Sequence, residues 1–413
     1  MHTLQLFNPA DPAFIANPYP FYRRLREESP VYHDAALGGW WLTGFAEVAG
    51  LMGDPRLIHP PMSTSGHLHP AGGREASVEN LGKVLATMML VSNPPKHTRL
   101  RRVFSQVFGH DSVTAFRPQI GTVADEVLNS LTDRRRVDLV GDFAFPMATA
   151  VIMRFLGVPA HDRDTIAALM PGMLAIIYEP GQGDAHGHAA HEYNDNLLWL
   201  TRYVTEMVES RRRRPSEDRL SRLIAEADND SRVTGEDLIV NVALVFLTAI
   251  PKIAYYLGNA MFALLSHREG MRDLVAGRCP AASAAEELLR FESPVQIAVP
   301  QLIADDITLN GHHLPRGELV HLVLGAANRD PARFPDPDRL DLHRPPRHHL
   351  GFGVGLHNCL GAALAREQGQ EIIPRFVRRF PEMHLDLTAP APQFHAVSHV
   401  RSLKSLPVVL DHA

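Results

Sequence analysis

The chain has 413 residues, of which 45% are hydrophobic and 21% charged, a composition typical of a water-soluble globular protein. A net charge of −5 gives no support to nucleic acid or an anionic membrane as the main partner. The two cysteines, Cys279 and Cys359, exclude a disulfide framework and fit a reducing cytosol. The first residues lack the basic and apolar segments of a signal peptide, so we expect a cytoplasmic protein.

Helical periodicity dominates the chain, and no internal repeat or low-complexity linker interrupts it. We predict helices at residues 18–28, 96–108, 111–132, 145–155, 162–174, 190–213, 235–267, 282–291 and 359–379. Strand signals lie at residues 30–34, 39–44, 306–315 and 318–324, and the tail 395–410 is typical of paired strands. Residues 328–351, rich in Pro, Asp and Arg, predict irregular coil. The sequence therefore predicts a mainly α fold with small β-sheets (α+β), organised as a single domain over residues 1–413.

Two segments need an explanation beyond periodicity. The run Arg211–Arg214 is a dense basic block, which we expect to be a solvated loop after a helix. The stretch from Leu238 to Ser266 is long enough to cross a membrane. Asn241, Pro251 and Lys252 lie within it, so we predict a buried helix of a soluble core and no membrane partner.

The stretch "GFGVGLHNCLG" at 351–361 carries the sharpest chemical signal. Glycines before and after Cys359 let the backbone turn tightly and approach a flat ligand closely. A thiolate at a helix N-terminus gains from the helix dipole and from free amides, which lower its pKa. The complete pattern is Phe352-Gly353-x-Gly355-x-His357-x-Cys359-x-Gly361.

This pattern resembles the haem-binding loop of the cytochrome P-450 family, in which the Cys thiolate is the proximal iron ligand. The resemblance implies haem b, with Cys359 as the metal ligand and with Phe352, Gly353 and Gly361 as haem-binding residues. A thiolate ligand pushes electron density to the iron and favours O–O cleavage. The resemblance also implies the P-450 fold, a triangular helical body with the haem between a long central helix and the Cys-ligand loop.

A second motif agrees with the first. Glu287-x-x-Arg290 is an i,i+3 pair on one face of a predicted helix, which alone is a weak signal. Followed by "NRDPARFPDPDRLDLHR", it resembles the family's Glu-Arg-Arg structural triad, with Arg344 as the third member. The resemblance runs from about Asn17 to Leu410, nearly the whole chain.

Haem-propionate contacts are implied in the same way. "HTRLR" places His97 and Arg101 one helical turn apart, like the family's propionate contacts, and His357 is a further propionate neighbour. The Arg that usually follows "SPVQ" and pairs with a propionate is absent. Pro300 and Gln301 stand in that region instead.

The long central helix departs from the family pattern. In the family it carries a small residue, then an acid followed by an alcohol, which deliver protons to iron-bound dioxygen. Counting back from "LGNAMFALLSH" puts Ala249 at the position of the small residue, Pro251 at that of the acid and Lys252 at that of the alcohol. We therefore expect these three residues at the catalytic position, with non-standard oxygen activation.

Alternatives to this interpretation stay open. Thr248 is the alcohol in another register, which needs a four-residue insertion before Gly258. Lys252 either snorkels along the helix to a surface or lies beside the haem, where an ammonium needs a partner. That partner is a substrate carboxylate or other acceptor, a protein carboxylate, or the iron itself. Pro251 costs roughly 3 kcal/mol in a regular helix but fits a helix that is already distorted.

Three functions follow from the resemblance. The first is a bacterial-type oxygenase that takes electrons from a ferredoxin and its reductase, with Arg99, Arg102 and Arg366 as candidate contacts for an acidic redox partner. The second is a haem-thiolate enzyme that uses peroxide, couples or cyclises its substrate, or isomerises it without oxygen insertion. Fatty-acid peroxygenases of the superfamily carry an Arg-Pro pair in this helix, similar in kind to Pro251-Lys252. The third is a non-catalytic haem protein that binds a ligand.

The substrate pocket is expected to be mostly aliphatic and rich in Met, which suits a hydrophobic or aromatic metabolite, with a carboxylate where Lys252 binds it. The family analogy places the protein in specialised metabolism, as a monomer or weak dimer. The residues predicted to line the pocket are Met89, Leu90, Phe246, Ile297, Val299 and Ser398.

Overall fold

The structure of the chain is a computed structural model that describes residues 8–60, 87–178, 188–397 and 399–411. The described residues fall into two compact units that alternate along the sequence. Unit 1 is formed from Met1–Ile58, Ile120–Phe145 and Lys252–Ala413, and unit 2 from His59–Gln119 and Pro146–Pro251. The prediction of a single domain stays a prediction, and each unit is described in its own terms.

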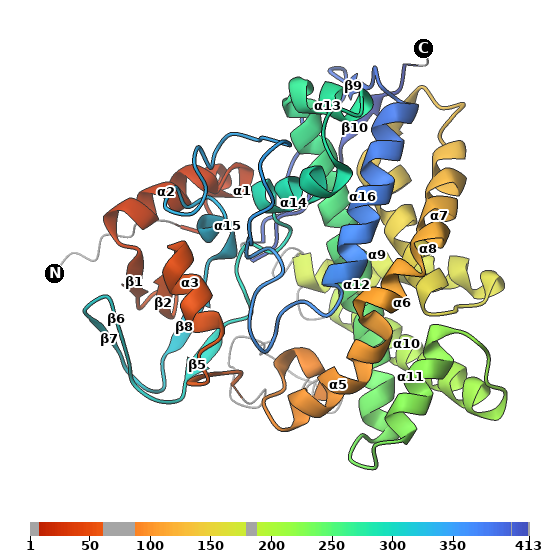
Figure 1. Cartoon of the computed structure of the whole chain (residues 1–413), viewed down its shortest axis with the longest axis horizontal. Helices are drawn as coiled ribbons and strands as arrows, with labels where there is room; N and C mark the ends of the chain where they lie inside the picture. The colour runs from red at the N-terminus through yellow and green to blue at the C-terminus, as the bar shows by residue number, and fades with distance from the viewer. Residues whose placement is uncertain (1–7, 61–86, 179–187, 398, 412–413) are drawn as a thin grey trace. The chain divides into compact units, whose positions relative to one another are not determined.

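Unit 1 holds the sheets and a group of helices, which Figure 1 labels. Its elements are α1 (Pro12–Ala16), α2 (Tyr19–Glu28), β1 (Val31–Asp34), β2 (Gly39–Leu42), α3 (Phe45–Met52), β3 (Leu57–Ile58), β4 (Arg136–Asp138), the π-helix η3 (Leu139–Ala144), α13 (Arg268–Val275), α14 (Ala281–Phe291), β5 (Gln301–Ile303), β6 (Ile307–Leu309), β7 (His312–Leu314), β8 (Leu319–Leu322), α15 (Leu324–Ala327), α16 (Ala362–Arg379), β9 (His384–Leu385) and β10 (Pro407–Val409).

The largest sheet has the strand order β1-β2-β8-β5-β3. Only the β2–β8 pair is parallel, with Trp41 opposite His321, and the other pairs are antiparallel. β6 and β7 form a separate hairpin closed by Asn310 and Gly311, whose φ angles are 49° and 80°. Asn-Gly is the preferred pair for such a two-residue turn, because both positions need positive φ. The strand signal at 306–315 is therefore a hairpin.

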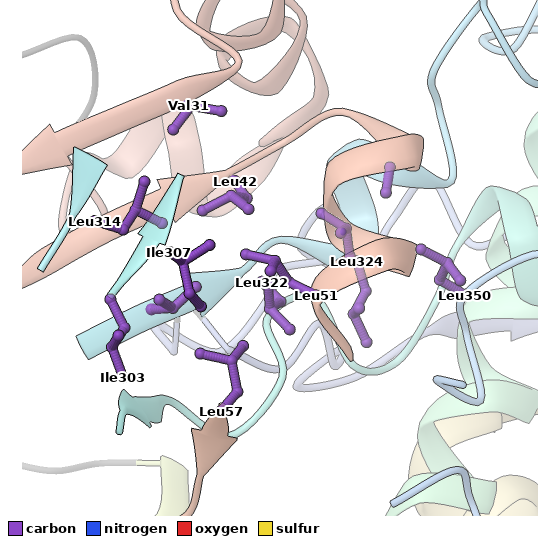
Figure 2. Close-up of a cluster of buried hydrophobic side chains, with 13 residues drawn as sticks. Val31, Leu42, Leu51, Leu57, Ile303, Ile307, Leu314, Leu322, Leu324 and Leu350 are labelled. Atoms are coloured by element: carbon purple, nitrogen blue, oxygen red, sulfur yellow. The ribbon is translucent and has the colours of Figure 1, made fainter. Parts of the chain in front are cut away.

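A cluster of aliphatic side chains forms the core of this sheet (Figure 2). Leu42 of β2 and Leu322 of β8 belong to this cluster, and α3 contributes Leu51. The cluster also includes Leu350, which is 1% exposed and directly precedes the glycine-rich segment 351–361. The start of the predicted ligand loop is thus anchored in a packed core.

Three helices pack closely in unit 1, and Figure 1 shows them side by side: α14, α16 and the second half of α12 (Gly235–Ser266). Tyr256 of α12 donates a hydrogen bond from its hydroxyl to the carbonyl oxygen of Ala285 in α14 (3.1 Å). A Cβ atom at Gly369 of α16 would overlap the Tyr256 hydroxyl. Glycine at this position therefore allows α16 to approach α12 closely.

Unit 2 is helical. It contains η2 (Met89–Val91), α5 (Lys96–Phe108), α6 (His110–Thr114), η4 (Ala160–Asp162), α9 (Arg163–Tyr178), α10 (His188–Arg213) and α11 (Arg219–Asp228). α10 packs against α9 and α11, and α11 packs against α5. The guanidinium of Arg219 lies 4.5 Å and 4.8 Å from the ring centroids of Phe116 and Phe155, which fixes α11 over an aromatic core.

Three helices cross from one unit to the other: α7 (Arg117–Asn129), α8 (Phe145–Phe155) and α12. In α12 the division falls between Pro251 and Lys252. α12 is the one helix in the described part of the chain that is long and apolar enough to span a membrane, and 78% of its most apolar window is buried in the structure. The prediction of a buried helix is confirmed.

Several predicted elements differ from the structure. The helix expected at 111–132 is two helices, α6 and α7, because Pro118 has no amide to continue the hydrogen-bond ladder. α16 begins at Ala362, after the cysteine rather than at it. The tail 395–410 pairs more sparsely than expected: Phe394 and Leu403 form an isolated antiparallel bridge, and the amide of His395 donates to the carbonyl oxygen of Ser402 (2.9 Å). Its one named strand, β10, pairs with β4 and β9.

The basic block at 211–214 is also not a loop. Its first three residues form the last turn of α10, where positive charge is favourable. Arg211 forms an ion pair with Asp218 (2.6 Å), and Arg212 with Asp228 (2.6 Å). The expectation of a loop was wrong, whereas Arg212, Arg213 and Arg214 are exposed as expected. The acidic partners Asp218 and Asp228 lie 7 and 16 residues further along the chain.

Candidate functional site

The loop that ends at Cys359 is held in shape by its own backbone. The amide of Cys359 donates to the carbonyl oxygen of Phe352 (2.8 Å), and the amide of Gly353 donates to that of Leu350 (2.9 Å). Gly353 and Gly355 have φ angles of 64° and 76°, in the left-handed region that favours glycine. The predicted glycine pattern is therefore required by the turn itself.

The same loop packs against the end of α3. A Cβ atom at Gly355 would lie 2.9 Å from the carbonyl oxygen of Met52 and 3.0 Å from Cα of Gly53. At Gly353 it would lie 2.9 Å from Cε of Met52. The backbone of the loop can rest on α3 only because these two positions lack a side chain.

Cys359 is exposed, whereas Cys279 is buried. It lies two residues before Gly361, the N-cap of the 18-residue helix α16, and the amide of Ala362 donates to its carbonyl oxygen (3.3 Å). A Cβ atom at Gly361 would approach the sulfur to 4.0 Å. An exposed cysteine beside a helix N-terminus, on a glycine-rich backbone, fits a thiolate that ligates the iron of a flat cofactor.

The predicted triad is confirmed. Nε and Nη2 of Arg290 lie 2.7 Å and 2.8 Å from the two carboxylate oxygens of Glu287, and Nε of Arg344 lies 3.2 Å from one of them. Glu287 and Arg290 are each about 2% exposed, so both charges depend on this pairing. The weak surface-pair interpretation of Glu287-x-x-Arg290 does not apply.

Asn328 connects the triad to the cysteine loop, and sequence reasoning missed it. Its backbone oxygen accepts from Nη1 of Arg290 (2.8 Å), and its side-chain oxygen accepts from the amide of Leu350 (2.6 Å). Its amide nitrogen donates to Ser293 (2.8 Å), and the residue is completely buried. The only sequence signal for it was its place at the start of the "NRDPARF" stretch.

Lys252 is the first residue of α12 that belongs to unit 1. Its side chain is partly accessible, and the described carboxylates of unit 1 form no ion pair with it. Nζ lies 5.8 Å from the ring centroid of Tyr255, a weak cation–π contact. Burial lowers the pKa of the ammonium to about 8, so the amine is close to half-protonated just above neutral pH.

His399 is a second basic group close to Lys252 in unit 1, and sequence reasoning missed it. The residue as a whole is exposed, and local desolvation of its ring, followed by the charge of Lys252, lowers the pKa of its imidazole to about 4. The His399 carbonyl oxygen accepts from the amide of Gln296 (2.9 Å), which fixes the turn against the segment before β5. Because the His399 imidazole is neutral at pH 7, Lys252 carries the positive charge of this pair.

The other central-helix residues lie in unit 2. Pro251 is buried and Ala249 is partly accessible, and α12 runs through both without interruption. The hydroxyl of Thr248 donates to the carbonyl oxygen of Leu244 (2.7 Å), one turn back in the same helix. This hydrogen bond orients the hydroxyl along its own helix, and its oxygen can still accept, so the alternative register stays open.

A pair of histidines lies at the start of α5 in unit 2. His97 is 1% exposed, and burial together with the charge of Arg101 lowers the pKa of its imidazole. The pKa of His59 falls to about 4, mainly through burial and then through the neighbouring His97. Asn93 fixes the His59 backbone by accepting from its amide (2.9 Å) and donating to its carbonyl (2.8 Å). Sequence reasoning found His97 and Arg101 but missed His59, which had no motif around it.

Known proteins resemble this chain over almost its whole length. The biotin biosynthesis cytochrome P450 of Bacillus subtilis (strain 168) is 31% identical over 405 residues, which cover 97% of this chain and 98% of that protein. This chain is a cytochrome P450. The vitamin D(3) 25-hydroxylase of Pseudonocardia autotrophica is 34% identical over 400 residues, which cover 96% of this P450 and 94% of that protein.

Family and structural comparisons agree with this assignment. The family model described as cytochrome P450 matches residues 282–406. The solved structure of P450BioI in complex with hexadec-9Z-enoic acid ligated acyl carrier protein has a TM-score of 0.84 and 30% identity, with 97% of this P450 and 99% of that chain covered. The chain is thus a P450 oxidoreductase with the P450 fold, and the family carries a haem-thiolate cofactor, acts on small molecules and uses redox partners.

The residues predicted to line the P450's pocket differ in accessibility. Met89 and Ile297 are buried, Phe246 is completely buried, and Leu90 and Val299 are 42% and 41% exposed. Ser398 lies outside the described residues. In unit 2, the segment around Met89 is held by Asn241 of α12, whose side-chain oxygen accepts the Met89 amide (2.7 Å).

Two of the three arginines expected to meet a redox partner have partners of their own. Arg102 is paired with Asp230 in unit 2. Arg366 of unit 1 is paired with Glu286 (2.7 Å) and stacks on the ring of Phe352. Helix periodicity made both appear as free surface charge, because their partners lie 128 and 80 residues away in the sequence.

Proposed function

We propose that Cys359 ligates the iron of haem b in this P450. The exposed sulfur at the start of α16 and the glycine-rich turn around it support this assignment. Phe352, Gly353 and Gly361 are the proposed haem neighbours within the loop. When bound, a haem thiolate supplies one-electron and oxygen chemistry that protein side chains lack.

The propionate contacts are a further part of this proposal. We assign them to His97, Arg101 and His357, following the family pattern. A neutral imidazole at His97 donates one hydrogen bond, and the always-charged guanidinium of Arg101 forms charge-assisted ones. The lowered pKa of His97 supports hydrogen bonding rather than charge as its contribution.

Cys359→Ser is expected to abolish the thiolate signature of the carbon-monoxide complex, because an alcohol does not replace a thiolate as iron ligand at neutral pH. Cys279→Ser is the matched control and is expected to keep that signature, since Cys279 is buried and burial raises the pKa of its thiol. The measurement is the absorption spectrum of the reduced carbon-monoxide complex. A thiolate spectrum that persists in Cys359→Ser would contradict the assignment.

We infer that the substrate is a hydrophobic or aromatic metabolite that carries a carboxylate, and that Lys252 binds this group. The observation that carries the inference is the ammonium of Lys252, which has no ion pair among the described carboxylates of unit 1. A partly buried charge of this kind is stabilised by a counter-charge. A substrate carboxylate supplies it.

Lys252 then has two tasks. It fixes the acid end of the substrate, which orients the carbon to be oxidised. Its Nζ also holds a proton that is released near pH 8, so the lysine can donate protons. In the family pattern the acid and alcohol at positions 251 and 252 have this task. Ala249 is the proposed small residue of the motif, by its register in α12. The names of the relatives, which include biotin biosynthesis and vitamin D(3) hydroxylation, support a biosynthetic metabolite as substrate.

Electron supply is proposed to come from a ferredoxin and its reductase in the cytoplasm, with the chain acting as one P450 domain, monomeric or weakly dimeric. The alternative is a peroxide-dependent, coupling, cyclising or isomerising enzyme, and the replacement of the acid-alcohol pair by Pro251-Lys252 favours it. Both candidates use the same cofactor and the same Lys252.

Turnover experiments separate the two candidates. An oxygenase is expected to convert substrate with dioxygen, ferredoxin and reductase at least about tenfold faster than with peroxide alone, because peroxide bypasses the electron-transfer steps only inefficiently. Product is measured by mass spectrometry with ¹⁸O-labelled dioxygen. Faster conversion by peroxide, or a product without the label, would assign the alternative.

A further inference from the structure

The partly buried carboxylate of Glu286 contacts one residue on each side of the cysteine loop in unit 1. Glu286, on α14, lies 2.7 Å and 3.2 Å from Nε and Nη2 of Arg366 on α16. Its other contact is Nε2 of His349, at 3.2 Å, just before the loop begins. Burial opposes its ionisation, but hydrogen bonds to His349 and Arg366 lower the pKa of Glu286 to about 2, so it is charged at neutral pH.

Both partners of Glu286 contact the loop directly. The guanidinium carbon of Arg366 lies 4.5 Å from the ring centroid of Phe352, a stacked cation–π contact. Nδ1 of His349 accepts a hydrogen bond from the amide of Gly351 (3.0 Å), and its ring centroid lies 5.8 Å from that of Phe352. Phe352 is in turn the residue whose carbonyl oxygen accepts the Cys359 amide.

We propose that Arg366, held by Glu286 and stacked on Phe352, is a positioning residue that fixes the cysteine loop and sets the reduction potential of the iron. The proposal rests on the proposed ligation by Cys359. It replaces the expectation that Arg366 is a docking contact for a redox partner. The path runs from the ion pair through the Phe352 ring and backbone to the amide beside the sulfur.

The ion pair makes a directional prediction about the potential. Glu286 and Arg366 neutralise each other, so removing one leaves the other's charge near the thiolate. Arg366→Leu leaves a negative charge, which stabilises the oxidised iron and is expected to lower the potential. Glu286→Gln leaves a positive charge and is expected to raise it. Glu286→Gln combined with Arg366→Leu is expected to return close to the natural value.

Positioning is tested separately from charge. Arg366→Lys keeps the positive charge but loses the planar group that stacks on Phe352. We expect this variant to keep the potential, while the amides of Gly351 and Cys359 exchange at least about tenfold faster, as expected for a lost contact of hydrogen-bond strength. Hydrogen–deuterium exchange with mass spectrometry over residues 350–361 measures this in the purified full chain.

Arg375→Leu is the matched control, because Arg375 forms an ion pair with Glu371 (2.9 Å) on the same helix, further along it from the loop than Arg366. Potentials are measured by titration with a chemical reductant, so that ferredoxin docking does not contribute. Unchanged potentials in both single variants, or shifts in the same direction, would overturn the proposal. An effect of Arg366→Leu on ferredoxin affinity alone would restore the docking role. Absence of a thiolate spectrum in the natural protein would instead refute ligation by Cys359.

Discussion

Replacing Glu287 by alanine is expected to lower the free energy of unfolding by about 3–5 kcal/mol, the usual cost of breaking a buried ion pair from one side. Glu287 is the only carboxylate that the structure pairs with both Arg290 and Arg344 in the described chain. Arg290 is 2% exposed, so its charge would be left buried without a counter-charge. We expect this loss to be the largest of the proposed single substitutions in unit 1.

The damage is also expected to reach the cysteine loop. Arg290 donates to the backbone oxygen of Asn328, and Asn328 accepts the amide of Leu350 where the loop begins. A displaced Arg290 therefore loosens the anchor of the loop, and haem retention should fall together with stability. Urea unfolding followed by circular dichroism and by haem absorbance measures both.

Glu382→Ala is the control for Glu287→Ala, because Glu382 is an exposed carboxylate in the turn before β9. It is expected to change stability by no more than about 0.5 kcal/mol. A loss of less than about 1 kcal/mol in the free energy of unfolding of Glu287→Ala would contradict this prediction. The triad would then contribute no more to stability than exposed ion pairs usually do.

The parts of this P450 that could be predicted from sequence are those fixed by local chemistry. The glycines of 351–361 were recognisable because a left-handed turn and a close approach to α3 leave no room for another residue. The predicted helix at 96–108 agrees with α5, which begins at Lys96 directly after Pro95, its N-cap residue. Where a proline was overlooked, at Pro118, one predicted helix became two.

What could not be predicted depends on partners far away in the sequence. Arg366 has the periodicity of a surface residue, and only the fold brings Glu286 to it from 80 residues away. Asn328 and His399 carry no motif, and their roles come from the backbone groups placed beside them. Charge and periodicity identify which residues can form an ion pair, but not which ones do.

Lys252→Met is expected to have two opposite effects, of which the first is higher stability. The pKa of Lys252 is lowered from 10.5 to about 8, so the unfolded chain binds the proton more tightly than the folded one. Below pH 8 this costs about 2–3 kcal/mol, somewhat less than the full shift because water reaches part of the side chain. The cost fades as the pH rises from about 8 to 10.5, where both states lose the proton.

The stability gain of Lys252→Met should therefore be largest at pH 7 and should vanish above pH 10.5. Thermal unfolding of the ligand-free protein at several pH values measures it. Lys404→Met is the control, since Lys404 is exposed and its replacement should leave stability unchanged at every pH. A gain that does not depend on pH would show better packing by methionine rather than relief of a buried charge.

The second effect of Lys252→Met is a loss of substrate binding. Removing one partner of a dehydrated charge pair is expected to weaken a carboxylate ligand about 100-fold. Aryl- and alkyl-carboxylic acids, each compared with its primary amide, are suitable probes, and binding is followed by the change in the haem spectrum. Only the acids should lose affinity in the variant, and in the natural protein their affinity should fall as the pH rises through about 8.

Equal loss for acids and amides would assign Lys252 a packing role, and a nitrogen-ligated iron spectrum in the natural protein would assign the lysine to the iron. A protein that gains stability and loses binding through the same residue would show that Lys252 is retained for its ligand, at the expense of the fold.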